Sequence, residues 1–170
     1  MMNEQDAVNL LKTVEKMGID VWIDGGWGVD ALIGRQTRPH NDIDIFIEQK
    51  HGAAIIEMLV SKGYQETKME YTTENHTVWS DKDNRIIDLH LFEFTQEGTL
   101  CFENENYPLK MFSGKGKICG IEVRCLPAES QLLYHQGYDH DEEDVHDVRL
   151  LCEKFELPVP KEYEYAIETT

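Results

Sequence analysis

The sequence has little positive charge for its size. Its 16 Lys and Arg stand against 33 Asp and Glu, so the formal net charge is −17 with His neutral. A field of this sign repels the phosphates of nucleic acids and of anionic membranes, and it attracts cations. We therefore expect no nucleic-acid partner and no membrane partner, and we expect a small cationic molecule as the ligand.

Long apolar runs and closely spaced cysteines are also missing. The longest run of apolar side chains covers only residues 53–56, far short of the ~20 residues that a transmembrane helix needs. The first residues, Met-Met-Asn-Glu-Gln-Asp, lack the basic and then apolar opening of a signal peptide. None of the four cysteines forms a CxxC pair, which favours reduced structural thiols. These features predict a cytoplasmic protein.

The content that is present is that of a folded domain. With 170 residues and 41% hydrophobic residues the chain can bury a sizeable core without disulfides or a structural metal. Periodicity predicts helices over residues 3–18, 30–33, 52–62, 127–136 and 142–155. Strands are expected over residues 21–23, 41–48, 77–80, 85–94 and 117–125, with a long connection over 98–116 and no ordered helix after Pro158 and Pro160.

This order of elements predicts an α+β fold with a helical C-terminal third. No linker or repeat divides the chain, so we expect a single domain over residues 1–170. Its core would cover about residues 1–125, and its helical C-terminal part about residues 126–157.

Two expected strands display carboxylates. Along residues 41–48 the isoleucines point one way, whereas Asp42 and Asp44 point the other. Along residues 85–94, Asp88 shares a face with His90. Each pattern predicts a half-buried strand with acidic groups on one side.

Asp42 and Asp44 are two residues apart, about 6.6 Å along a strand, so their carboxylates can converge on one cation. Without a cation, two like charges about 4 Å apart cost roughly 4 kcal/mol at an effective dielectric of about 20. Oxygen ligands favour Mg²⁺ over Zn²⁺. The alternative is a pair of aspartates on a solvated strand edge.

Gly25 and Gly26 lie between a strand and a short helix, where bare backbone N–H groups can hold a phosphate. An ordinary turn is the alternative. Arg38 and His40 come just before the two aspartates and are candidates to bind phosphate oxygens. For Arg38 the alternative is an ordinary surface arginine.

The segment 139–147 carries six acidic residues in nine. Such a run is typical of a solvated helix start, where carboxylates favour the positive end of the helix dipole. The alternative is an acidic wall that attracts a protonated amine, with Tyr138 and Asp139 nearest to the site.

Three stretches carry a family resemblance. Residues 22–30, Trp-Ile-Asp-Gly-Gly-Trp-Gly-Val-Asp, and residues 38–44, Arg-Pro-His-Asn-Asp-Ile-Asp, resemble the antibiotic nucleotidyltransferases of the polymerase-β superfamily. Residues 127–139, Pro-Ala-Glu-Ser-Gln-Leu-Leu-Tyr-His-Gln-Gly-Tyr-Asp, resemble the small lincosamide nucleotidyltransferases more than the aminoglycoside 2″-nucleotidyltransferases. The resemblance does not extend to residues 95–116 or to the last fifteen.

The resemblance implies a polymerase-β-like fold, with a mixed sheet flanked by helices. It implies transfer of a nucleoside monophosphate from a nucleoside triphosphate, with ATP as the favoured donor, to a hydroxyl of a lincosamide. The reaction would release pyrophosphate and inactivate the drug. Asp42 and Asp44 would hold Mg²⁺, two ions in all, and Asp88 would complete the metal site, accept the hydroxyl proton, or do both. His90 would orient Asp88 or touch the substrate, unless it is simply a hydrogen-bonded strand histidine. The resemblance also points to a homodimer.

Three alternatives remain for the function. One is an aminoglycoside 2″-nucleotidyltransferase, because both drug classes carry protonatable amines. Another is a nucleotidyltransferase that modifies a protein partner. The last is a non-enzymatic acidic module that only binds a cation.

Overall fold

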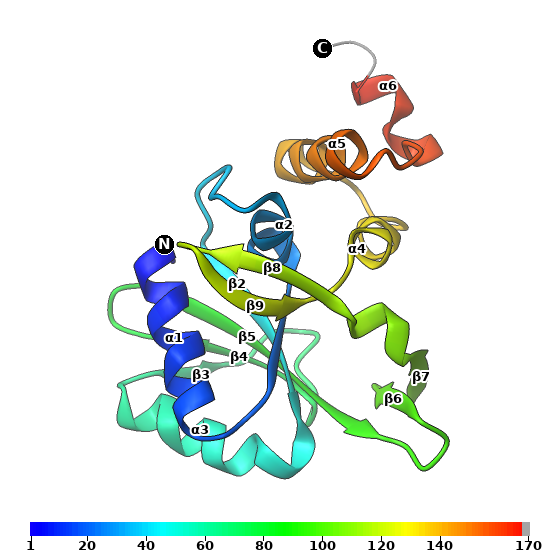
Figure 1. The fold of residues 1–170 in the computed structure, drawn as a ribbon. Coiled ribbons are helices and arrows are strands. Elements are labelled where there is room, and N and C mark those ends of the chain that lie inside the picture. The colour runs from blue at the N-terminus through cyan, green and yellow to red at the C-terminus, as the bar shows by residue number, and fades with distance from the viewer. Residues whose placement is uncertain (168–170) are drawn as a thin grey trace.

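The structure, a computed structural model, describes residues 1–167 as one mixed β-sheet with helices around it (Figure 1). Within these residues the strand order is β3-β4-β5-β2-β1-β9-β8, and the hairpin β6-β7 extends from the end of β5. The expected α+β class is confirmed.

The strands of this sheet are β1 (Val21–Asp24), β2 (Asp42–Glu48), β3 (Gln65–Thr67), β4 (His76–Ser80), β5 (Ile86–Phe94), β6 (Thr99–Phe102), β7 (Glu105–Pro108), β8 (Gly114–Ile118) and β9 (Ile121–Cys125). The α-helices are α1 (Glu4–Lys16), α2 (Gly25–Ile33), α3 (Gly52–Ser61), α4 (Ala128–Tyr134), α5 (Glu142–Phe155) and α6 (Glu164–Ile167). Short 3₁₀ helices are η1 (Gln49–His51), η2 (Leu109–Phe112) and η3 (Lys161–Tyr163).

One face of the sheet is apolar and packs against α1 and α3. The isoleucines of β2 point to this face, as their alternation predicts, and join the main core with the apolar sides of both helices. Helix α1 begins where expected, because the Asn3 side chain accepts from the Asp6 backbone N–H and the Asp6 side chain accepts in return from the N–H of Asn3. This packing leaves the carboxylates of β2 on the opposite face.

The C-terminal helices pack around α2. Val29 of α2 lies in a second core cluster with Leu132 of α4 and Val148 and Leu151 of α5. In Figure 1, α4, α5 and α6 lie together on the α2 side, away from α1 and α3. The acidic start of α5 is a helix cap, since the Asp141 side chain accepts from the backbone N–H groups of Glu143 and Asp144.

Several expected elements were wrong. The connection over 98–116 contains β6, β7 and η2, because Leu100 and Phe112 cover the aromatic residues Phe46 and Phe92 on the face opposite the isoleucines. The strand expected over 117–125 is the hairpin β8-β9, which turns at Cys119 and Gly120 with positive φ at both.

The helix expected over 30–33 is only the end of α2, which starts at Gly25, and α6 follows Pro160 where no helix was expected. All four cysteines are free thiols, as predicted. In the described part of the chain, no helix combines the length and the apolarity that a membrane span requires.

Candidate active site

Three carboxylates lie side by side on three neighbouring strands. Antiparallel pairing of β1 and β2 sets Asp24 opposite Asp44. Parallel pairing of β2 and β5 sets Asp44 beside Asp88. Since neighbouring strands are about 4.8 Å apart, this register builds a continuous line of acid groups, which we call the carboxylate row (Asp24, Asp44 and Asp88).

Asp42 adds a further carboxylate to this row. It precedes Asp44 by two residues on β2, so both side chains leave the same face of the sheet. Burial and the charges of Asp44 and Asp88 raise the pKa of Asp42 to about 6. Part of Asp42 is exposed to solvent, and the neighbouring charges contribute to this rise beside burial. The structure thus brings together the three aspartates that the sequence singled out.

Asp24 was not singled out by the sequence. Burial, followed by the charge of Asp44, raises its pKa to about 6. Asp24 is the N-cap residue of α2, but its side chain makes no capping hydrogen bond. The Asp24 carboxylate is therefore free to belong to the carboxylate row. The same strand alternation that revealed Asp42 and Asp44 would have revealed Asp24, had β1 been extended by one residue to its observed end.

The oxygen donors fit a divalent cation such as Mg²⁺. Carboxylate oxygens are the donors that this hard cation prefers. The charge of Asp44 is among the causes that raise the pKa values of Asp24 and Asp42, and a bound cation would relieve this repulsion. Asp42, Asp44 and Asp88 are the residues available to hold it.

Gly25 and Gly26 start α2 next to the row. Gly25 has a φ of +57°, and a Cβ atom there would lie 2.2 Å from Asp44 Oδ2. At Gly26 a Cβ atom would lie 2.5 Å from His40 Nδ1 and 2.6 Å from an Arg38 guanidinium nitrogen. Both glycines thus allow a close approach of these side chains to the N-terminus of α2.

Arg38 and His40 lie over Gly26, but both are held by carboxylates of the protein. His40 is 3% exposed, and its Nε2–H donates to Asp30 Oδ2 at 2.5 Å. Arg38 donates to the fully buried Asp147 at 2.8 Å and to Glu143 at 2.5 Å, which ties the loop before β2 to α5. Their role in binding phosphate stays a prediction.

His90 follows Asp88 by two residues on β5, and its register partners are Phe46 on β2 and His76 on β4. Its Nε2 is 3.7 Å from Asp44 Oδ1 and 3.8 Å from Asp88 Oδ1. Burial lowers the pKa of His90, but the nearby carboxylates of Asp44, Asp88 and Asp24 outweigh this and raise it overall. His90 is thus a strand histidine in contact with the acidic row.

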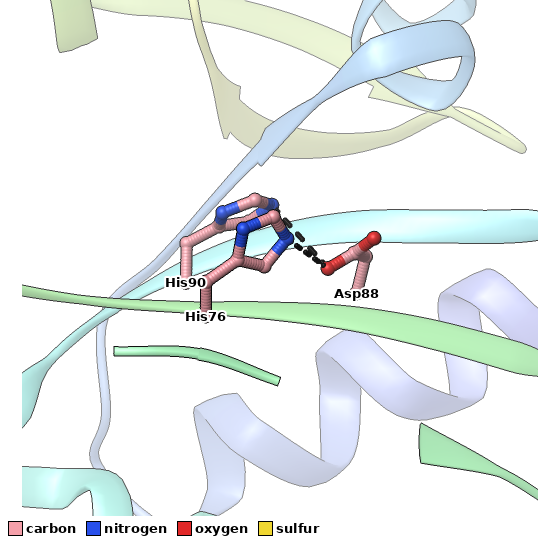
Figure 2. A group of neighbouring side chains, drawn as sticks. All are labelled: His76, Asp88 and His90. Atoms are coloured by element: carbon pink, nitrogen blue, oxygen red, sulfur yellow. Dashed lines mark hydrogen bonds and ion pairs between the residues drawn. The ribbon is translucent and has the colours of Figure 1, made fainter. Parts of the chain in front are cut away.

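His76 is a second histidine at the row, and the sequence did not single it out. Its Nε2–H donates to Asp88 Oδ1 at 2.7 Å (Figure 2). The expected strand began at Thr77, one residue too late. Pairing the hairpin arms from the Asp81 turn outward would have placed His76 opposite His90.

Tyr138 and Asp139 lie in the exposed loop between α4 and α5. The Tyr138 hydroxyl donates to Asp144 Oδ1 at 2.8 Å. Among residues 1–167, no hydrogen bond or ion pair joins either residue to the carboxylate row. Their contact with a substrate stays a prediction.

Gln131 marks the point where α4 meets α2. It is fully buried, and its Nε2 lies 2.3 Å from where a Cβ of Gly28 would be. Neither amide atom has a hydrogen-bond partner within the described residues. This contact requires glycine at position 28 and joins the C-terminal helices to the site helix.

Comparison with known proteins gives consistent matches. The family model described as aminoglycoside-2''-adenylyltransferase matches residues 7–151. A lincosamide resistance protein of Staphylococcus haemolyticus is 30% identical over 160 residues, which are 88% of this chain and 94% of that protein. A 2''-aminoglycoside nucleotidyltransferase of Escherichia coli is 37% identical over 68 residues, 38% of each chain.

Solved structures agree. The lincomycin-bound lincosamide antibiotic adenylyltransferase LnuA superposes with a TM-score of 0.79 at 30% identity, over 88% of this chain and 96% of that one. ANT(2'')-Ia in complex with adenylyl-2''-tobramycin has a TM-score of 0.71 at 22% identity, over 98% and 94%, and supports the fold alone. With a family model that covers most of its length, this chain belongs to the aminoglycoside-2''-adenylyltransferase family.

Proposed function

We propose that this protein is a Mg²⁺-dependent nucleotidyltransferase. It transfers a nucleoside monophosphate from a nucleoside triphosphate, with ATP as the favoured donor, to a hydroxyl of a lincosamide. The observation that carries the proposal is the register of Asp44 with Asp88 on parallel neighbouring strands, with Asp42 on the same face. The N-terminus of α2 lies against this group, because Asp44 approaches Gly25 closely.

In this proposal each residue has a chemical role. Asp42, Asp44 and Asp88 hold the magnesium, and the family resemblance implies two ions. Magnesium, when bound, neutralises charge on the triphosphate and lowers the pKa of the acceptor hydroxyl. The backbone N–H groups at the start of α2, at Gly25 and Gly26, bind phosphate oxygens with help from the helix dipole.

Asp88 is the proton acceptor. His76 occupies one of its oxygens, Oδ1, which leaves the other for the incoming hydroxyl. The hydroxyl oxygen bonds to the α-phosphorus, the bond from that phosphorus to the bridging oxygen breaks, and the electron pair leaves with pyrophosphate. The hydroxyl proton goes to Asp88.

Two observations favour a lincosamide as acceptor. The likeness to the lincosamide resistance protein spans 88% of this chain, whereas that to the E. coli aminoglycoside enzyme spans 38%. The structural likeness to lincomycin-bound LnuA, at a TM-score of 0.79 and 30% identity, agrees with this. The −17 charge suits the protonated amine of either drug class. We place Tyr138, Asp139 and His90 at the drug.

Mass spectrometry tests the acceptor. Lincomycin, clindamycin, kanamycin and tobramycin are each incubated with the protein, Mg²⁺ and a mixture of nucleoside triphosphates, with EDTA as the control. We expect a nucleoside-monophosphate adduct on the lincosamides that EDTA abolishes.

An adduct on the aminoglycosides alone would establish the 2″-nucleotidyltransferase alternative, which the family model's description favours. No adduct on any drug would refute drug modification and direct the search to a protein acceptor. A homodimer stays a prediction, which sedimentation of the same sample tests.

A further inference from the structure

Two imidazoles and a carboxylate converge at the β4 side of the carboxylate row. His76 of β4 and His90 of β5 are register partners, and Asp88 lies one side-chain row away on β5. His76 Nε2 is 2.7 Å and His90 Nε2 is 3.8 Å from the same atom, Asp88 Oδ1. Figure 2 shows both rings turned toward that carboxylate, and the ligand atoms of the group all lie within 4.8 Å of one another.

Packing holds the two rings in this position. His90 stacks on Phe46 with a centroid distance of 4.5 Å and an interplanar angle of 12°. His76 lies against His90 at 4.3 Å, and Phe102 meets the His90 ring edge-on at 5.4 Å. The ring positions are therefore set before any ligand arrives. The side chains of His76, His90 and Asp88 are 22%, 12% and 13% exposed, so none of the three is fully buried.

The donor set differs from that of Asp42 and Asp44. Two imidazole nitrogens with one carboxylate suit Zn²⁺ and related transition metals, whereas Mg²⁺ prefers oxygen donors. In a tetrahedral Zn²⁺ site with bonds of about 2.0–2.1 Å, ligand atoms are about 3.3–3.5 Å apart. The observed separations of 2.7 and 3.8 Å lie on either side of that range, so small side-chain shifts would complete the site.

We propose that His76, His90 and Asp88 form a site for a divalent transition-metal ion of the Zn²⁺ type, and that its occupation inhibits the enzyme. Asp44 Oδ1, 3.7 Å from His90 Nε2, is positioned to serve as a further ligand. A zinc-type ion here engages Asp88, the proton acceptor, and competes for Asp44. The inhibition rests on the proposed function, whereas the binding does not.

Cobalt(II) is the probe for binding, because its visible absorption reports imidazole and carboxylate ligation directly. We titrate the full chain with Co²⁺ in excess Mg²⁺, and then displace the cobalt with Zn²⁺. We expect one tightly bound Co²⁺ that Zn²⁺ displaces and Mg²⁺ does not. His76→Asn and His90→Asn each remove a ligand, so each should weaken binding by more than the roughly 10–100-fold that loss of an outer-shell partner costs.

His51→Asn is the matched control. His51 lies on η1, outside the cluster, and its substitution should leave the cobalt spectrum unchanged. Absence of a bound-cobalt spectrum in the unmodified chain would overturn the proposal without reference to any variant. Equal binding by the unmodified chain and by folded His76→Asn and His90→Asn, with folding checked by circular dichroism, would overturn it as well.

The inhibition is measured separately, as Zn²⁺-dependent loss of pyrophosphate release in saturating Mg²⁺. Each variant is compared with its own zinc-free rate. We expect zinc to inhibit the unmodified chain at least tenfold more strongly than His76→Asn, in line with the loss of a ligand. Equal zinc sensitivity would refute the inhibition through this site. If no drug is modified, the cobalt titration still decides whether the site exists.

Discussion

Replacing Asp24 by Asn should stabilise the ion-free protein. Asp24 lies in register with Asp44, and its pKa is raised from 3.8 to about 6 by burial and by that neighbouring charge. The folded state therefore holds more protons than the unfolded state between these two values, and the free energy of unfolding falls as the pH rises through this window. Asn removes the charge and keeps the shape.

The magnitude follows from the shift. A rise from 3.8 to about 6 corresponds to roughly 3 kcal/mol at neutral pH, at about 1.4 kcal/mol per pH unit. Because Asp24 is partly exposed, solvent screening reduces this to about 1–2 kcal/mol. The side chain makes no capping hydrogen bond to α2, so no cap is lost. In a chain of 170 residues the gain corresponds to a rise in Tm of about 3–6 °C.

The assay is thermal unfolding of Asp24→Asn and the unmodified chain in EDTA, at a series of pH values. The difference in Tm should be near zero below about pH 3.8 and complete above about pH 6, where Asp24 is charged. Saturating Mg²⁺ should reduce the difference in Tm between the variant and the unmodified chain, because a bound cation neutralises the charge of Asp44. A variant that is less stable at neutral pH, or a difference in Tm that does not depend on pH, would show that the Asp24 charge does not destabilise the fold.

Four other substitutions have defined outcomes. Asp42→Ala and Asp44→Ala should each abolish nucleotidyl transfer. In EDTA the Tm of each variant should be unchanged or higher, because the substitution relieves like-charge repulsion. A large fall in Tm would instead show that these carboxylates are structural. Gly25→Ala should lower stability by about 1–3 kcal/mol and impair activity, because its Cβ would lie 2.2 Å from Asp44 Oδ2 at a φ of +57°; chemical denaturation and turnover test this. Arg38→Ala should cost about 3–5 kcal/mol in urea unfolding by leaving Asp147 buried without its cation, and a loss below about 1 kcal/mol would contradict the importance of this pair.

Strand alternation was enough to predict which side chains share a face. It placed Asp42 with Asp44, and Asp88 with His90, because a period of two is a local property of the chain. It could not place Asp44 beside Asp88, since that depends on which strands pair and in what register. Only the family resemblance joined the two strands at the sequence level.

Contacts distant in sequence had no local signal. Arg38 and Asp147 are 109 residues apart, and nothing near either residue indicates that they pair. The hairpin β6-β7 was missed because its strands are only four residues long, and it is stabilised by tertiary contacts of Leu100 and Phe102 with the aromatic cluster. Tertiary packing overrides local propensity in such segments.

In the proposed metal-dependent nucleotidyl transfer, Asp88 accepts the proton of the acceptor hydroxyl. The most direct test compares Asp88→Asn with the unmodified chain in Mg²⁺-dependent ATP binding and in lincomycin modification measured by mass spectrometry. We expect ATP binding to be largely retained and turnover to fall by about 10²–10⁴-fold, the usual contribution of a general base. Turnover within a few-fold of the unmodified chain would rule out Asp88 as the proton acceptor.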